Sequence, residues 1–164
     1  MVMAMLKGRI EPINAQRFKY LKDSLNSAGE TPLSTREIFR ALILPIANDQ
    51  AKSANSKEIL AQLVARSFPE PVRFIERMQR RFLGELADIF INELQRTYPH
   101  ATKKELYWNF HLVISSLLGT LAQQRRLHDF SRGLCDDSDS EDMRNRLIDF
   151  VSTAFDAGIC SPRS

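Results

Sequence analysis

The stretch from Thr102 to Ser131 constrains the fold most, because it has the pattern of one long helix that is apolar almost all the way round. At roughly 100° per residue, its apolar residues form two stripes on nearly opposite sides. The broad stripe consists of Leu106, Tyr107, Phe110, His111, Val113, Ile114, Leu117, Leu118 and Leu121. The second stripe consists of Trp108, Leu112, Ser115, Gly119 and Ala122. A helix packed on a single core needs only one stripe, so the second stripe predicts a second burial surface.

Two surfaces could cover this second stripe. Its Ser, Gly and Ala positions would let another helix approach closely, and the same helix of a second copy is the obvious candidate. A membrane is the alternative, but Asn109, His111 and two serines interrupt the apolar run. The run therefore falls short of the roughly 20 apolar residues that a membrane span requires. The pattern favours a homodimer and no membrane partner.

Length and composition indicate a single domain covering residues 1–164, large enough to fold without disulfides or metals. We expect a cytoplasmic location, because the N-terminal apolar run is too short for a secretory signal. Cys135 and Cys160 lack the spacing of a zinc or redox motif and are interpreted as free thiols. The net charge is only +3, and the basic residues are not interleaved with exposed aromatics. For those basic residues, the pattern favours a solvated helix face over a nucleic-acid surface.

Turn and cap signals divide the chain into about six helices, and no sustained period-2 alternation indicates a sheet. Ser34 with Glu37, and Thr102 with Glu105, have the spacing of capping boxes. Gly158 is predicted to cap the last helix. The expected helices run from about Met3 to Ser27, from Ser34 past Pro45, from Ser56 to Phe68, from Pro71 to Tyr98, from Thr102 to Ser131, and from Ser140 to Ala157. The predicted fold class is all-α.

No catalytic or cofactor motif accompanies these helices. The sequence has no glycine-rich phosphate loop, no HExxH, no ExxH pair and no GxSxG, so we predict no catalytic residue, no cofactor and no metal site. His111 stands out because it lies in the broad apolar stripe of the long helix. It is either a core histidine bonded to a neighbour or a polar contact in a ligand pocket.

Several segments together are similar to one family. They are RIEPINAQRFKYLKDSL (residues 9–25), REIFRALILPI (36–46) and YWNFHLVISSLLGTLA (107–122), followed by a short acidic loop and one last helix. This combination resembles the C-terminal regulatory domain of TetR-family transcriptional repressors. The similarity is nearest to the branch of PsrA-like, fatty-acid-responsive regulators.

The resemblance implies a dimer in which the last two long helices of each subunit form a four-helix bundle. It also implies a small-molecule pocket between the first, middle and long helices, suited to an apolar or acyl-like effector. The expected interface residues are Leu112, Ser115, Gly119, Ala122, Leu147, Val151 and Phe155. The pocket candidates, each also open to a plain core role, are Phe18, Leu21, Phe39, Ile43, Phe74, Met78, Phe82, Trp108, His111 and Ile114.

One departure from the family pattern is large. The DNA-binding helix-turn-helix of the family has no counterpart in this sequence, which begins where the connecting helix is expected. The resemblance therefore predicts an effector-sensing and dimerisation domain that controls DNA binding only through a helix-turn-helix absent from this chain. The alternative is a stand-alone helical interaction protein that pairs with a complete repressor and binds no ligand.

Overall fold

The computed structural model describes residues 2–51, 80, 83–122, 126–135 and 140–160. Six helices are named in these ranges, and the described residues form no strand, so the all-α prediction is confirmed. The helices are α1 (Val2–Ala28), α2 (Thr35–Ala51), α5 (Gly84–Thr97), α6 (Lys103–Ala122), α7 (Arg126–Phe130) and α8 (Ser140–Cys160).

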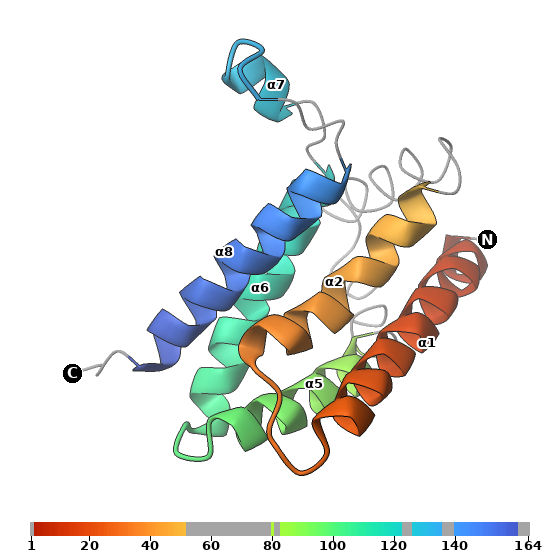
Figure 1. The fold of residues 1–164 in the computed structure, drawn as a ribbon. Helices are drawn as coiled ribbons and strands as arrows, with labels where there is room; N and C mark the ends of the chain where they lie inside the picture. The colour runs from red at the N-terminus through yellow and green to blue at the C-terminus, as the bar shows by residue number, and fades with distance from the viewer. Residues whose placement is uncertain (1, 52–79, 81–82, 123–125, 136–139, 161–164) are drawn as a thin grey trace.

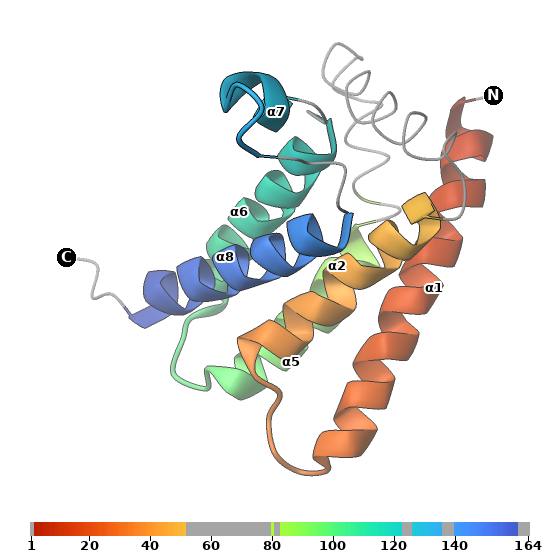
Figure 2. The ribbon, with the colours of Figure 1, turned by 45° about the horizontal axis from the view of Figure 1, so that its top comes forward.

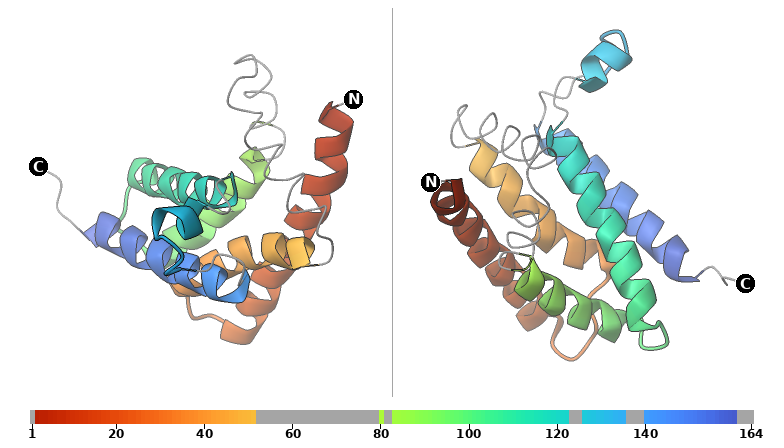
Figure 3. Two further views of the ribbon diagram at one scale, coloured as in Figure 1. Left: turned by 90° about the horizontal axis from the view of Figure 1, so that it is seen from above. Right: turned by 180° about the vertical axis from the view of Figure 1, so that it is seen from behind.

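Helix α2 occupies the middle of the bundle. It packs against α1, α5 and α8, while α6 packs against α5 and α8 (Figures 1 and 2). Seen from above and from behind, α6 and α8 lie side by side at one edge, with α1 at the opposite edge (Figure 3). The pair α6 and α8 therefore forms one outer side of the subunit.

The core gathers buried apolar side chains from α1, α2, α5, α6 and α8. Phe39 of α2 meets Phe155 of α8 with ring centroids 5.2 Å apart, and Phe90 of α5 stacks with Phe110 of α6 at 6.4 Å. Helix α6 contributes Leu106, Phe110, Val113, Leu117 and Leu121 to the buried cluster. These residues belong to the predicted broad stripe, so that side of α6 does face the core.

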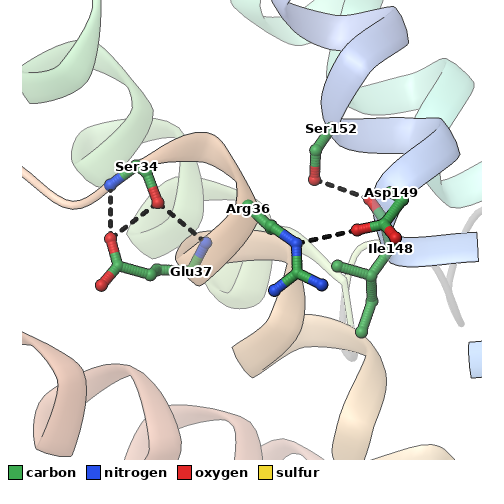
Figure 4. A network of polar contacts seen from close by, with 6 residues as sticks. All are labelled: Ser34, Arg36, Glu37, Ile148, Asp149 and Ser152. Carbon is green, nitrogen blue, oxygen red and sulfur yellow. Dashed lines mark hydrogen bonds and ion pairs between the residues drawn. The ribbon is translucent and has the colours of Figure 1, made fainter. Parts of the chain in front are cut away.

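Both predicted capping boxes are confirmed, and Figure 4 shows the one at Ser34. The backbone N–H of Ser34 donates to Glu37 Oε2 at 2.8 Å, and the backbone N–H of Glu37 donates to Ser34 Oγ at 3.3 Å. The same reciprocal pair joins Thr102 and Glu105, at 2.9 and 3.2 Å. Hydrogen bonds from Ser34 hold the pKa of the Glu37 carboxyl below its ordinary value. Each box thereby satisfies helix-end donors that would otherwise lack partners.

Polar contacts connect α8 to the helices around it. Arg36 Nε donates to Asp149 Oδ1 at 2.8 Å, with both side chains at least half exposed (Figure 4). An exposed pair of this kind adds little stability but fixes orientation. Deeper in, the Tyr98 hydroxyl lies 2.7 Å from Thr35 Oγ1 and donates to Asp156. Tyr98 thus joins the end of α5 to both α2 and α8.

Arg17 is a buried cation between α1 and α2, with 5% of its surface exposed. Its Nε donates to the carbonyl oxygen of Leu42 at 2.8 Å, and Nη1 donates to Asn14 Oδ1 at 2.8 Å. Burial lowers the pKa of Arg17 to about 10. These hydrogen bonds offset part of the cost of removing the guanidinium from water.

The prediction that Gly158 caps the last helix is wrong. Helix α8 continues to Cys160, and Gly158 lies inside it against α6. A Cβ at position 158 would overlap Asn109 Oδ1 and lie 3.1 Å from Asn109 Cγ. The absence of a side chain at Gly158 therefore allows α8 to pack closely against α6. Asn109, which interrupts the apolar run of the long helix, is buried at 5% exposure and donates through Nδ2 to the Glu105 carbonyl at 2.9 Å.

Other predicted bounds also need correction. The long helix expected from Thr102 to Ser131 is instead α6, ending at Ala122, and the separate short helix α7. Residues 120–132 contain no glycine or proline that would indicate a division. The helix expected from Pro71 to Tyr98 is not continuous, because Leu83 is the N-cap of a helix that begins at Gly84. The helix expected from Ser56 to Phe68 lies outside the described residues.

We predict that Ser34→Ala lowers the free energy of unfolding by about 1 kcal/mol at pH 7, because one cap donor loses its acceptor. This decrease in the free energy of unfolding should be smaller at acidic pH. Since the folded-state pKa of Glu37 is lowered, its contribution is present above the ordinary carboxyl pKa and disappears as the pH falls through the folded value. Urea unfolding at pH 7 and pH 3 measures both effects. Ser27→Ala, at an exposed hydroxyl within α1, is the control and should change stability little at either pH. A Ser34→Ala effect that is equal at both pH values would contradict the role of Glu37.

Gly158→Ala should destabilise the fold by about 1–2 kcal/mol despite alanine's better helix propensity, because the new Cβ displaces the buried Asn109 amide. Gly8→Ala is the matched control, since nothing lies within 4 Å of a Cβ there, and it should be neutral or stabilising. Thermal unfolding of both variants and of Gly158→Ala in an Asn109→Ala background measures the clash. In the Asn109→Ala background, Gly158→Ala should no longer lower the melting temperature. A melting temperature that is still lowered would contradict the clash with Asn109.

Candidate functional site

The outer side of α6 and α8 exposes large apolar side chains. Trp108 is 58% exposed, Leu112 56% and Phe150 64%, and Tyr107 beside them is 42% exposed. Their helices form one edge of the bundle, away from α1 (Figure 3). We call this surface, defined by Trp108, Leu112 and Phe150, the α6/α8 face. Several large apolar groups gathered on one face are typical of an interaction surface.

A hollow lies in this face between the two helices. It is small, with a volume of about 50 Å³, is open to solvent, and has Leu112 and Phe150 in its lining. The small residues Ser116 and Ala154 also line it, which leaves room between the larger side chains. The remaining lining residues are Asn109, Val113, Val151 and Phe155. The face therefore combines protruding apolar groups with a recess, as a self-complementary contact requires.

The hydroxyl groups on α6 do not oppose burial of this face. Ser115 Oγ donates to the His111 carbonyl and Ser116 Oγ to the Leu112 carbonyl, each at 2.9 Å. Thr120 Oγ1 donates to the Ser116 carbonyl at 2.8 Å. Because these donors are satisfied inside their own helix, an apolar partner can cover them without leaving buried hydrogen-bond donors unpaired.

The structure brings most of the predicted interface residues to this side. Leu112, Ser115 and Gly119 are exposed on α6, and a Cβ added to Gly119 would meet nothing within 4 Å. Leu147 is half-buried against the core. Val151 and Phe155 are only 2% and 1% exposed, so they form the floor of the hollow more than its surface. The side chain of Ala122 lies outside the described residues.

The pocket candidates separate into groups. Leu21, Phe39 and Ile43 are buried with at most 3% exposure, and Phe18 and Ile114 pack against the same cluster. Trp108 and His111 are instead exposed beside Leu112, with ring centroids 6.4 Å apart. The structure therefore does not bring these two together with the inward group. Phe74, Met78 and Phe82 lie outside the described residues.

Two features of this side were not predicted. Phe150 lies off the stripe of Ile148, Val151 and Phe155 and is largely exposed. The spacing of those three at intervals of three and four would have identified it as the odd residue. The Tyr107 hydroxyl donates to Asp88 Oδ1 at 2.9 Å, which links α6 to α5 at the surface and raises the pKa of Tyr107.

The described part of the chain has neither a metal-binding cluster nor a membrane-spanning helix. Among these residues, no three His, Cys, Asp or Glu side chains gather as they would around a metal ion. None of the described helices has the length and apolar character needed to cross a bilayer.

The comparisons with known proteins bear on the same helices. Residues 40–154 match the family described as "Tetracyclin repressor-like, C-terminal domain". No curated protein matches the chain. The matched range includes most of α2 and α8 and all of α5, α6 and α7. With its all-helical bundle and a match over more than half of its length, the chain belongs to the C-terminal domain family of TetR-like repressors.

Proposed function

We propose that this protein is the effector-sensing and dimerisation domain of a TetR-family transcriptional repressor. Its role is regulatory: a small apolar or acyl-like effector bound within the bundle changes the DNA binding of the regulator to which the domain belongs. We further propose that residues 1–164 form a single domain of the PsrA-like branch. Family membership supports the general role, and the effector class is our own inference.

The observation that carries the proposal is the α6/α8 face. Trp108, Leu112 and Phe150 are each more than half exposed, next to a hollow and to hydroxyls that already have partners. A second copy placed face to face would bury all three groups and complete a four-helix bundle. A two-fold contact closes on itself, so it yields dimers and not filaments.

The effector site is proposed between α1, α2 and α6. Phe18 and Ile114 pack against the core without being fully buried, and Leu21, Phe39 and Ile43 are buried in the same core. An apolar lining with few polar groups suits an acyl chain. Binding there would favour one tilt of α1 over another, and Pro12 inside α1 is a candidate hinge.

A second function keeps the dimer face but has no ligand. The near-complete burial of Leu21, Phe39 and Ile43 favours it, because a filled core leaves less room for an effector. In that case the chain would pair with a complete repressor and block its DNA binding. Native mass spectrometry separates the two functions, since a co-purifying acyl molecule supports the sensor and its persistent absence supports the interaction protein.

Gly119→Arg should convert the dimer to a monomer without unfolding the subunit. The open space at Gly119 accommodates a side chain in the single subunit, whereas a charged side chain on the covered face would disrupt pairing. Phe150→Asp should act in the same way. Sedimentation velocity at micromolar protein, together with circular dichroism, provides the measurement. Tyr20→Asp, an exposed aromatic on α1, is the control and should stay dimeric. A wild-type protein that is monomeric at micromolar concentration would contradict the proposed dimerisation function.

A saturated long-chain fatty acid should raise the melting temperature of the wild type, because binding to the native state alone stabilises it. In Ile114→Trp the added bulk should reduce or abolish this rise while the dimer persists. Lys19→Trp, at an exposed neighbour of Phe18, controls for the added indole and should keep the rise. Differential scanning fluorimetry with the fatty acid and with a matched short-chain acid measures the effect. An equal rise in all three proteins would show that the fatty acid does not bind at the proposed site.

A further inference from the structure

The short helix α7 and the turn after it carry apolar side chains that no other described part of the subunit covers. Leu127 is 44% exposed, Phe130 82% and Leu134 90%, and the last two exceed every other large apolar residue of the described chain in exposure. None of the residues of α7 is buried, and α7 stands away from the bundle beyond the ends of α6 and α8 (Figures 1 and 3). We call Leu127, Phe130 and Leu134 the α7 apolar cluster.

The segment that carries this cluster has a defined conformation. The N–H of Gly133 donates to the His128 carbonyl at 2.8 Å, and the N–H of Ser131 donates to the Leu127 carbonyl at 2.9 Å. Ser131 Oγ accepts from the Cys135 N–H at 2.9 Å. Arg132 has a positive φ of 53°, a conformation that costs a residue with a Cβ some strain. Hydrogen bonds thus hold the turn, at the cost of that strain, in a form that leaves Phe130 and Leu134 in solvent.

The position of the cluster is restricted by the chain on both sides. Three residues connect Ala122 of α6 to α7, and four residues connect Cys135 to the start of α8. At about 3.5 Å per residue, such links keep the cluster close to the ends of both helices of the α6/α8 face. Any molecule that covers this face therefore brings its edge within reach of the α7 apolar cluster.

We infer that the α7 apolar cluster is a second contact between two copies of this chain, at the rim of the pairing surface formed by α6 and α8. The inference rests on the dimer of the proposed function and adds to it a residue set outside the four-helix bundle. The second copy is the favoured occupant because the cluster continues the same uncovered edge, and because a two-fold pair presents the cluster twice and so covers both copies at once.

The test is the dimer dissociation constant of the double variant Phe130→Ser and Leu134→Ser, measured by sedimentation over a dilution series. Removal of two apolar groups from the contact should raise the constant by about 10- to 100-fold. The double variant Arg126→Ser and Asp129→Ser is the matched control. It changes two exposed residues of the same helix, keeps the net charge, and should shift the constant by less than about threefold.

Cys135 is a native reporter for the same contact, since it is exposed in the single subunit and adjoins Leu134. In a Cys160→Ser background, alkylation by iodoacetamide followed by mass spectrometry should be several-fold slower in the dimer than in Gly119→Arg monomers. The Phe130→Ser and Leu134→Ser variant should lose this protection.

Two results would overturn the inference while leaving the proposed function intact. One is an unchanged dissociation constant for the α7 variant while Gly119→Arg is monomeric. The other is equal alkylation of Cys135 in dimer and monomer, even if the α7 variant dimerises less well. A Gly119→Arg protein that remains dimeric would instead refute the α6/α8 pairing itself.

Discussion

The packing of α2 is the constraint on which the rest of the subunit depends. Between residues 38 and 46, only Arg40 is exposed and only Leu44 is half-buried, so this helix presents apolar surface in nearly every direction. Pro45 has no backbone N–H and weakens this helix taken by itself. Neighbours on several sides must therefore stabilise it, and α1, α5 and α8 supply them. The buried Arg17 of α1 also stabilises α2, because its Nε donates a hydrogen bond to a carbonyl oxygen of that helix.

This arrangement also explains why one side of the bundle stays uncovered. Helix α8 turns Ile148, Val151 and Phe155 inward, and α6 is placed by α5 and α8 at the edge of the core. Once these contacts are made, no described helix is left to cover Leu112 or Phe150. The subunit buries α2 almost completely but leaves the α6/α8 face partly uncovered. This incomplete burial is the physical reason to expect an external partner at that face.

The sequence predicted the elements whose signals are local. Reciprocal hydrogen bonds at Ser34 and Thr102 depend on residues three apart, and the two-sided pattern of α6 depends on spacing within one helix. It could not predict what depends on a distant neighbour. Gly158 reads as a cap until Asn109 is known to lie against it. His111 reads as inward because helical spacing gives the angle between residues but not the direction of the core. Spacing places Trp108 on the second stripe, and it is a pocket candidate only through the family resemblance. The division between α6 and α7 has no glycine or proline to mark it.

Under the proposed function, the same side chains connect the inside of the subunit to its outer face. Phe39, a pocket candidate, contacts Phe155 at 5.2 Å, and Phe155 lines the hollow of the α6/α8 face. Val113 likewise belongs both to the core cluster and to the lining of the hollow. Because cores are close-packed, an effector that displaces Phe39 must move Phe155 or open a cavity. Either response would alter the floor of the pairing surface, so ligand binding and subunit contact would be coupled without any long-range pathway.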